Sequence, residues 1–215
     1  MVYGARMRDR SRGSVAVLGG GGHAKVVIGT LRSAGATVTV VLDDNPATWG
    51  KTLLGVPVQG PIATLPDHGV DGAVIAIGSN AARAHVAAAV GDIAWITAVH
   101  PSAIIDPSVT LGPGTVVFAG VVIQPDARLG AHVIVNTGAT IDHDCVVDDF
   151  VHLAPGVQLA GDVVVGRSAF MGIGSVAIPG RRIGPGATVG AGAVVIRDVA
   201  AGATVVGVPA RSAAR

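Results

Sequence analysis

The second half of the chain repeats one pattern of hydrophobic and polar positions every six residues. From residue 105 to residue 200 an aliphatic residue opens each six, and sixteen consecutive sixes keep this register, with only Ala177 smaller than the rest. Helices repeat every 3.6 residues and half-buried strands every two, so a period of six predicts short flat strands joined by tight corners. The opening positions are Ile105, Leu111, Val117, Ile123, Leu129, Val135, Ile141, Val147, Leu153, Leu159, Val165, Met171, Ala177, Ile183, Val189 and Val195.

Three sixes form one coil of a triangular prism, in which equivalent residues of successive coils stack at the usual strand spacing of ~4.8 Å. The opening residues point inward, and small or β-branched residues in the fifth position, such as Val109 and Ala127, let the corners close. One coil cannot bury its own apolar residues, so several must stack. The outer faces are expected to be poor in aliphatic residues. The alternative, a β-sandwich, requires alternation at two and irregular loops, which this repeat does not have.

The first part of the chain has a pattern typical of alternating strands and helices. The apolar run Val15–Leu18 ends in the four glycines Gly19–Gly22, helical spacing follows over 23–35, and a strand follows over 37–42. This order of strand, glycine turn, helix and strand predicts a βαβ unit.

Further along, a strand is predicted over 73–77, a helix over 79–90 and a last strand over 95–99, which completes a small parallel α/β domain. Pro101 marks the junction with the repeat. The predicted organisation is a flexible tail over 1–13, a Rossmann-like α/β domain over 14–100, and a β-helix domain with a short extension over 101–215.

Composition narrows the classes of function. The net charge is +1 and charged residues make up 13% of the chain, so nucleic acids and membrane surfaces are not expected partners. Cys145 is the single cysteine, which excludes internal disulfides and fits a reducing compartment. No apolar run is long enough to span a membrane, and the basic start lacks the hydrophobic core of a secretory signal. We therefore expect a cytoplasmic protein.

The glycine turn is the first candidate binding site. Backbone N–H groups in such a turn approach a ligand closely, and the helix that follows presents its N-terminus, which favours phosphate. The turn also fits G-x-G-x-x-A, but the domain is about half the size of a full dinucleotide-binding sheet, so a mononucleotide or a nucleotide-sugar diphosphate is favoured over NAD. The alternative is a tight turn without a ligand.

Polar residues at the ends of neighbouring strands belong to the same predicted edge. Asp43 and Asp44 follow the second strand, and Gly78, Ser79 and Asn80 follow the next one. In α/β sheets ligands bind at the carboxyl ends of strands, so these residues are predicted to contact base or ribose. The alternative for the two aspartates is a solvated pair.

His143 is the main candidate for catalysis within the repeat. It stands in the third position of its six, a corner position, between Asp142 and Asp144. An imidazole beside carboxylates is held in one tautomer and becomes a better base. One coil later stands Gly161, and this small residue is expected to leave room for a substrate. The alternative is a surface histidine with incidental acidic neighbours.

Two other chemistries are disfavoured. His132, His143 and His152 occupy the fourth, third and sixth positions of their sixes, so they do not share one edge, and no metal site is predicted. Cys145 lies near His143, which suggests a nucleophile, but its fifth position belongs to the small, buried set, and core packing is favoured.

Several segments together resemble the sugar acetyltransferases of the bacillosamine and sialic acid type. They are the turn GGGGHAKVV, the strand end LDD, the repeat segment NTGATIDHDC and the later GVPA, and the resemblance covers roughly 14–211. It implies a left-handed parallel β-helix and a homotrimer with active sites between subunits. It also implies acetyl-CoA as donor and a sugar or nucleotide-sugar acceptor held by the N-terminal domain.

The resemblance also implies roles for particular residues. His143 matches the general base, and Asp144 its acidic partner, where close relatives carry Glu. Arg211 is included among the cofactor-binding residues, although its spacing does not decide whether it touches a ligand. Asn136, His152, Gly161 and Ile173 match positions along the acetyl-CoA, and Gly21, Gly22 and His23 match the turn at the acceptor diphosphate, with Asp43 or Asp44 near the base.

The sequence therefore favours N-acetylation of the amine of a nucleotide-linked amino sugar by direct transfer from acetyl-CoA. O-acetylation of a sugar such as sialic acid and a non-catalytic nucleotide-sugar-binding trimer remain alternatives. The sequence does not select the base, the sugar or the length of the acyl group.

Overall fold

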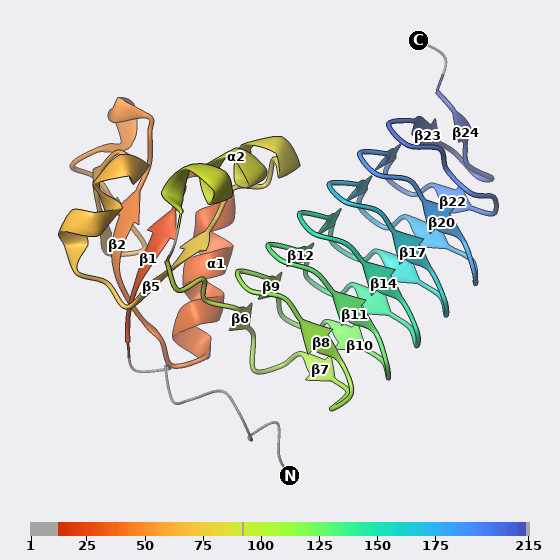
Figure 1. Cartoon of the computed structure of the whole chain (residues 1–215), viewed down its shortest axis with the longest axis horizontal. Coiled ribbons are helices and arrows are strands. Elements are labelled where there is room, and N and C mark those ends of the chain that lie inside the picture. The colour runs from red at the N-terminus through yellow and green to blue at the C-terminus, as the bar shows by residue number, and fades with distance from the viewer. Residues whose placement is uncertain (1–12, 92, 214–215) are drawn as a thin grey trace.

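The computed structural model of the chain describes residues 13–91 and 93–213, so the predicted tail, apart from Gly13, lies outside the described residues. A small α/β domain comes first and packs beside the first coils of a long parallel β-helix (Figure 1). The described helices do not include one long and apolar enough to cross a membrane.

The N-terminal domain is a five-stranded sheet with the order β3-β4-β2-β1-β5, parallel except for the pairing of β3 with β4. The predicted first strand, helix, second strand, later strand and second helix are confirmed, with the later strand ending two residues early. The elements are β1 Ser14–Leu18, α1 Gly22–Ser33, β2 Thr37–Leu42, η1 Pro46–Thr48, β3 Thr52–Leu53, β4 Val56–Gly60, η2 Ile62–His68, β5 Gly72–Ile75 and α2 Asn80–Val90.

Two strands and two short 3₁₀ helices between residues 46 and 68 did not emerge from the sequence pattern. The strand β4 carries Pro57, which weakens the signal of a strand, and β3 has only two residues. The strand β3 forms the edge of the sheet, and β4 lies between it and β2.

The helix α1 joins the two parts of the molecule. Its stripe of Ala24, Val27, Ile28 and Leu31 is fully buried, and the helix ends before Gly35, whose φ of 84° lies in the left-handed region that glycine adopts freely. The stripe belongs to a cluster that also contains residues of the sheet and of the first coils of the repeat. The helix is therefore packed between the sheet and the β-helix.

The predicted register of the repeat is confirmed at every six. Sixteen two-residue strands, β7 to β22, each place the opening residue of a six second. We call the sheet that carries the N-terminal domain the domain face; it contains β6 Ala98–Val99, β9 Val116–Val117, β12 Ile134–Val135, β15 His152–Leu153, β18 Phe170–Met171, β21 Thr188–Val189, β23 Thr204–Val206 and β24 Arg211–Ser212.

Two further sheets complete the prism. The β7 face contains β7 Ile104–Ile105, β10 Val122–Ile123, β13 Thr140–Ile141, β16 Gln158–Leu159, β19 Val176–Ala177 and β22 Val194–Val195. The β8 face contains β8 Thr110–Leu111, β11 Arg128–Leu129, β14 Val146–Val147, β17 Val164–Val165 and β20 Arg182–Ile183.

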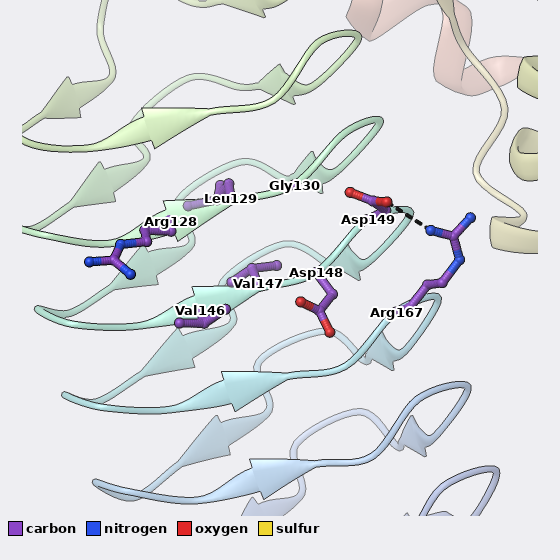
Figure 2. A pocket seen from close by; sticks show the side chains of 8 residues that line it. All are labelled: Arg128, Leu129, Gly130, Val146, Val147, Asp148, Asp149 and Arg167. Carbon is purple, nitrogen blue, oxygen red and sulfur yellow. Dashed lines mark hydrogen bonds and ion pairs between the residues drawn. The ribbon is translucent and has the colours of Figure 1, made fainter.

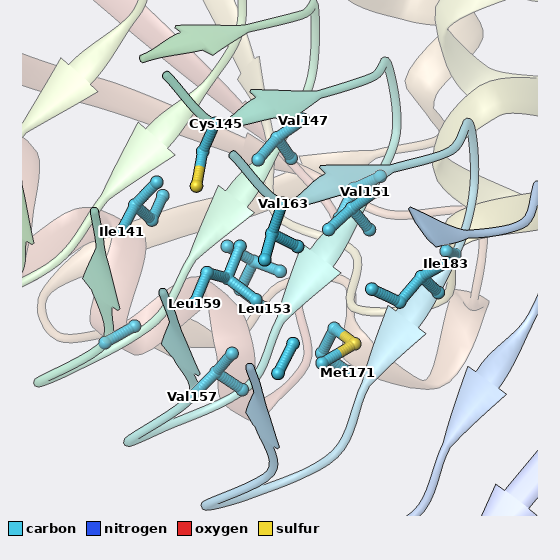
Figure 3. Packing of buried hydrophobic residues seen from close by; sticks show 14 of the residues in the cluster. Ile141, Cys145, Val147, Val151, Leu153, Val157, Leu159, Val163, Met171 and Ile183 are labelled. Atoms are coloured by element: carbon cyan, nitrogen blue, oxygen red, sulfur yellow. The ribbon is translucent and has the colours of Figure 1, made fainter. Parts of the chain in front are cut away.

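Ladders of inward side chains form the core of the prism. Ile123 pairs with Ile141, Ile141 with Leu159, and Leu159 with Ala177 along the β7 face. The fifth-position residues, including Cys145 and Val163, are buried in the same cluster (Figure 3). Burying each such aliphatic side chain contributes ~1.5–3 kcal/mol relative to exposure, and the ladders repeat that contribution in every coil.

The first coil begins earlier than the sequence predicts. The predicted strand over 95–99 is divided: Trp95 makes one bridge to Ala73 of the N-terminal sheet, whereas β6 pairs with β9 of the repeat. The chain therefore passes from one sheet to the other before it reaches Pro101.

The outer faces are richer in aliphatic residues than expected. Val122, Val176 and Val194 are the outward residues of their strands on the β7 face, as Val146 and Val164 are on the β8 face, and all five are half-buried. The expectation of aliphatic-poor faces is wrong, because the first residue of each two-residue strand, which points outward, is often β-branched too.

The last coil is closed by a hairpin. The strand β24 pairs antiparallel with β23 and so interrupts the parallel ladder of the domain face. An open ladder would offer unpaired backbone groups to another chain, and the hairpin ends that row. Arg211 lies on this hairpin and is exposed.

Candidate active site

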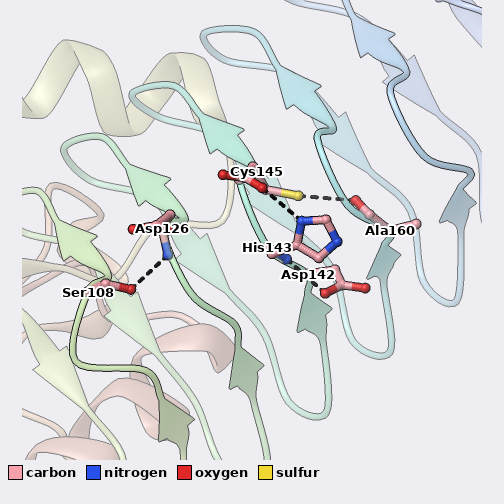
Figure 4. Close-up of polar contacts among 7 residues, drawn as sticks. Ser108, Asp126, Asp142, His143, Cys145 and Ala160 are labelled. Carbon is pink, nitrogen blue, oxygen red and sulfur yellow. Dashed lines mark hydrogen bonds and ion pairs between the residues drawn. The ribbon is translucent and has the colours of Figure 1, made fainter.

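His143 stands on the edge between the β7 face and the β8 face. The turn between β13 and β14 carries it, and its side chain is 60% exposed, as the corner position predicts (Figure 4). Its Nδ1 lies 2.8 Å from Oδ2 of Asp144. A carboxylate can only accept, so Nδ1 carries the proton, and Nε2 of the neutral ring presents a lone pair.

The local fold explains the pairing of these two residues. Asp144 has a φ of 60°, in the left-handed region that Asp adopts more readily than most residues. The Oδ1 of Asp142 accepts a hydrogen bond of 2.8 Å from the His143 backbone N–H and fixes the other side of the turn. The hydrogen bond from Nδ1 to Asp144 raises the pKa of His143 above its usual value, and the charges of Asp142 and Asp162 act in the same direction.

The prediction that Gly161 leaves room for a substrate above the imidazole is wrong. A Cβ atom at this position would lie 2.5 Å from Cε1 and 2.6 Å from Nε2 of His143. The space is taken by the imidazole itself, so the glycine allows the ring to lie flat against the next coil. The side chain as a whole is largely exposed, so the ring remains accessible from outside the coil stack.

A second polar group lies on the domain face. His152 is half-buried in β15, its Nδ1 is 3.2 Å from the carbonyl oxygen of Gly78, and its Nε2 is 3.4 Å from Nδ2 of Asn136. Burial lowers the pKa of His152 to about 4 against the opposing effect of the Gly78 carbonyl. His152 is therefore neutral at pH 7 and, because a carbonyl only accepts, it carries its proton on Nδ1.

Within one chain, His143 lies beside Gly161 but apart from the other predicted cofactor-binding residues. His143 and Gly161 lie on the edge where the β7 and β8 faces meet, which is the edge opposite the domain face. Asn136 and Ile173 follow the domain-face strands β12 and β18, and Ile173 is 61% exposed. The His143 edge and this group therefore lie on different sides of the prism.

The glycine turn is open at its tip. Gly21 and Gly22 are exposed, and a Cβ atom at either would meet nothing within 4 Å. The helix α1 begins here without a side-chain cap and without an acidic residue in its first turn. Its first N–H groups and its dipole are therefore available to an anion.

Asp43 shapes this turn, and its contact with base or ribose stays a prediction. Its Oδ2 accepts a hydrogen bond from the Gly20 N–H, and its Oδ1 accepts one of 2.8 Å from the Asn45 N–H. Asp44 points elsewhere: its Oδ1 accepts a 2.9 Å hydrogen bond from the Ile62 N–H, at the border of a hollow of about 500 Å³ between η2 and α2. Of the two predicted aspartates, Asp44 is the exposed one.

His23 is not a cation at the turn. Burial lowers its pKa to about 4, with the nearby His152 and Arg83 acting in the same direction. Its ring packs edge-on against Phe118 with the centroids 5.4 Å apart, and its Nε2 has no partner among the described residues. The position of His23 thus supports the turn through packing, and the backbone provides the donors.

Asn80 is used to fasten the two domains together. Its Nδ2 donates to the carbonyl oxygens of Ser168 and Ala169, at 2.9 and 3.0 Å, and its Oδ1 accepts from Arg83 at 2.8 Å. Both N–H groups and one lone pair of the amide are therefore used by protein contacts, and the role of Asn80 in substrate binding stays a prediction. Gly78 does lie beside the domain-face group, through its carbonyl contact with His152.

The sequence pattern did not lead us to identify Arg83 as an important residue. It is 1% exposed in α2 and bonds to both domains. A signal was present, because Arg83 shares one helical stripe with the half-buried or buried Val86 and Val90 at spacings of three and seven. An arginine in a position that the pattern reserves for an apolar residue indicates a buried polar role.

Other candidates carry no reaction chemistry. The prediction that Cys145 packs in the core is confirmed: it is 0% exposed, its Sγ donates to the Ala160 carbonyl at 3.2 Å, and burial raises its pKa to about 11 (Figure 4). No cluster of three potential metal ligands exists among residues 13–91 and 93–213. His132 is buried on the edge between the β8 face and the domain face, far around the prism from His143.

The β8 face also carries a shallow groove of about 410 Å³ (Figure 2). Arg128, Asp148, Asp149 and Arg167 supply its charged lining, and Asp149 pairs with Arg167 at 2.7 Å. None of the predicted site residues lines this groove.

Comparison with known proteins finds related sugar acetyltransferases. Residues 14–90 match the PglD N-terminal domain. The curated UDP-N-acetylbacillosamine N-acetyltransferase of Bacillus subtilis is 40% identical over 114 residues, which cover 49% of this chain and 51% of that protein. The chain thus spans about half the length of this curated relative.

Two solved structures are similar over nearly their whole length. A histidine variant of perosamine N-acetyltransferase from Caulobacter crescentus, in complex with CoA and GDP-perosamine, is 43% identical with a TM-score of 0.90, and the match covers 94% of this chain and 98% of that chain. The acetyltransferase domain of PglB from Neisseria gonorrhoeae, in complex with acetyl coenzyme A, is 36% identical with a TM-score of 0.87, over 94% and 100% of the two chains. The chain belongs to the family of PglD-like sugar acetyltransferases.

Proposed function

We propose that this protein transfers the acetyl group of acetyl-CoA to the amine of a nucleotide-linked amino sugar, in active sites shared between the subunits of a homotrimer. The observation that carries the proposal is the oriented, exposed His143–Asp144 pair in a chain 43% identical to an acetyltransferase crystallised with CoA and GDP-perosamine. The single buried cysteine agrees with a cytoplasmic location.

The chemistry requires a neutral amine and a place for its proton. The amine nitrogen attacks the thioester carbonyl carbon, and as the C–N bond forms, Nε2 of His143 accepts a proton from the nitrogen. The tetrahedral intermediate then collapses and expels the CoA thiolate, and the imidazolium donates its proton to this thiolate. No covalent enzyme intermediate is required, since both substrates are bound together and proximity supplies much of the rate.

Asp144 keeps His143 ready for this step. Its hydrogen bond holds the proton on Nδ1, so the lone pair of Nε2 faces outward, and its charge stabilises the imidazolium as it forms. The Gly161 N–H lies beside the ring and finds no acceptor among the described residues, which supports a role as donor to the oxyanion.

The acceptor is bound by the N-terminal domain. The open glycine turn at Gly21 and Gly22 meets the diphosphate through backbone N–H groups and the α1 dipole. Asp44, exposed at the end of β2, lies near the base. Asn136, His152 and Ile173 line the acetyl-CoA on the domain face, with Arg211 further along the same sheet.

The separation of these groups supports a trimer. The His143 edge of one subunit lies against the domain face of its neighbour, which is the arrangement that completes each site. Half-buried valines on the outer β7 and β8 faces provide apolar area for such packing. Each of the three sites then uses residues of two subunits.

An acceptor panel tests the function. Release of CoA thiol is measured with GDP-, UDP- and dTDP-linked amino sugars, with free sialic acid, and without acceptor. We expect release with an amino-sugar nucleotide only. Equal release with sialic acid would favour the O-acetyltransferase, and no release with any acceptor would favour a binding protein.

Replacing His143 by Ala should lower turnover by ~10²–10⁴-fold, the usual contribution of a general base. The fold should be retained, because the side chain is largely exposed and the Gly161 coil continues beneath it. Steady-state kinetics and thermal melting measure the two effects, and His68→Ala is the matched control. Near-normal turnover of folded His143→Ala would end the assignment.

Replacing Asp144 by Asn should move the acid limb of the kcat/KM profile to lower pH. The base acts only when deprotonated, and in the native protein Asp144 raises the pKa of His143, so activity falls as pH drops through that raised value. Without the carboxylate the pKa drops and the limb follows it, while the plateau falls less than in His143→Ala. An acid limb that stays at the same pH, or moves to higher pH, contradicts the role of Asp144.

Replacing Gly21 by Val should raise the KM of the acceptor strongly and leave that of acetyl-CoA nearly unchanged. The φ of Gly21 is −80° and a side chain there meets nothing within 4 Å, so the fold accepts it while the approach of a diphosphate is blocked. Gly29→Val, a change in open space further along α1, is the control. A silent Gly21→Val would remove the turn from the acceptor site.

Mixing two inactive variants should restore activity if the sites are shared. Trimers of His143→Ala lack the edge group and trimers of His152→Ala lack the domain-face group, so random exchange gives roughly one intact site in four. Turnover is followed after co-refolding, with light scattering to establish the trimer. A stable, fully active monomer, or mixtures that stay inactive, would contradict the shared site.

A further inference from the structure

Arg83 carries a buried charge without a carboxylate partner. Its side chain is 1% exposed, and its guanidinium hydrogen bonds within the described residues go only to backbone carbonyls and one side-chain amide. The acceptors are the carbonyl oxygens of His132 at 2.8 Å, Ile77 at 2.9 Å, Gly78 at 3.3 Å, Phe150 at 2.8 Å and Val151 at 3.4 Å, and Oδ1 of Asn80 at 2.8 Å.

This burial is costly and is not offset by an opposite charge. Burial lowers the pKa of Arg83 to about 10, so the group is still cationic at neutral pH. The charge of Arg83 acts on three histidines, His23, His132 and His152, each with its pKa lowered to about 4, mainly by burial and with a contribution from Arg83. A cation so placed, surrounded by neutral rings, is stabilised only by the carbonyl dipoles.

The six acceptors come from two parts of the molecule. Ile77, Gly78 and Asn80 belong to the loop at the carboxyl end of β5, in the N-terminal domain. The other three carbonyls lie on the edge between the β8 face and the domain face, where β11 leads to β12 and β14 leads to β15. One planar, rigid fork therefore fixes the orientation of the loop relative to the coils.

The same loop reaches the domain-face group. The Gly78 carbonyl accepts from Arg83 Nη1 and from Nδ1 of His152, so one oxygen is shared by both. Its position decides the tautomer of His152 and directs the Nε2 lone pair toward Asn136. A shift of this loop would move the strand end and the His152 ring together.

We propose that Arg83 is a positioning residue, which holds the Gly78 carbonyl and the loop 77–80 in the orientation that aligns the acceptor with the reacting groups. The inference rests on the proposed function, because the alignment matters only if the N-terminal domain carries the acceptor. Arg83 acts through the loop and through His152, and it touches neither substrate.

Arg83→Lys separates positioning from charge. Lysine keeps the cation but offers one compact group with three donors, which cannot reach the loop and both coil carbonyls at once. We expect the KM of the acceptor to rise at least about tenfold, the equivalent of one hydrogen bond to a charged group, and the KM of acetyl-CoA to change less, through the His152 ring alone.

Val116→Ala is the matched control for a general loss of stability. Val116 is 1% exposed in the cluster between α1 and the first coils, and it makes no hydrogen bond to the loop 77–80. We expect a lower Tm for both variants and an altered KM ratio only for Arg83→Lys. If the two variants have the same KM ratio, Arg83 contributes only to stability and the proposal fails.

A second variant guards against a failure to fold. Asn80→Ala removes the hydrogen bonds to Ser168 and Ala169 and one of the six acceptors of Arg83, and it leaves the five carbonyl acceptors in place. A smaller change of acceptor KM in the same direction is therefore expected. A normal acceptor KM in folded Asn80→Ala, together with an unfolded Arg83→Lys, contradicts the proposal.

The tautomer of His152 gives a readout that a purely structural role would not move. In histidine-labelled protein, ¹⁵N shifts should show the proton on Nδ1 in the wild type and a mixture of tautomers in Arg83→Lys. An unchanged tautomer with an unchanged KM ratio overturns the inference while wild-type acetyl transfer stands. Absence of transfer by the wild type in the acceptor panel would instead remove the proposed function.

Discussion

The hydrogen-bond ladder between successive coils is the constraint on which the rest of this structure depends. Each coil donates backbone N–H groups to the carbonyls of the next, as Val122 does to Ala139 and Thr140 does to Val157. This ladder fixes the rise per coil at the strand spacing and forbids any slip, because a shift of one residue would turn the inward ladder outward. Every functional group on the prism is thereby held at a fixed height and on a fixed face.

This rigid stack keeps His143 apart from the N-terminal domain. His143 is fixed on one edge, and the N-terminal domain is fixed on the face opposite that edge. Neither can move toward the other without breaking the stack, so flexibility within one chain cannot assemble the site. In the trimer that we propose, the edge of one subunit meets the domain face of the next, which brings the two groups together.

The contact between the two domains is unusually polar for a packed interface. An apolar cluster around α1 provides burial, while Arg83, Asn80 and His152 supply directional contacts to named carbonyls. Apolar contacts alone tolerate sliding, whereas hydrogen bonds at several fixed points define one orientation. The interface is therefore suited to holding the strand ends of the N-terminal domain at one position above the domain face.

The sequence by itself determined the parts that depend on local periodicity. The period of six predicts the sixteen strands, the inward ladder and the burial of Cys145, because side-chain direction in a short strand follows from position alone. The corner position of His143 and the glycine turn before α1 were predictable for the same reason. The local pattern did not predict β4, which contains Pro57. It also did not predict that Ala98–Val99 pairs with the β-helix instead of the N-terminal sheet.

Only the tertiary structure decided which groups share a neighbourhood. Asp43 and Asp44 are adjacent in the chain but diverge, one holding the turn and the other the edge of the hollow. Arg83 and Asn80 find their partners some 50 to 90 residues away, and no spacing in the sequence reports such contacts. Long-range packing sets these partners, because a buried polar group takes whichever carbonyls the fold brings within hydrogen-bonding distance.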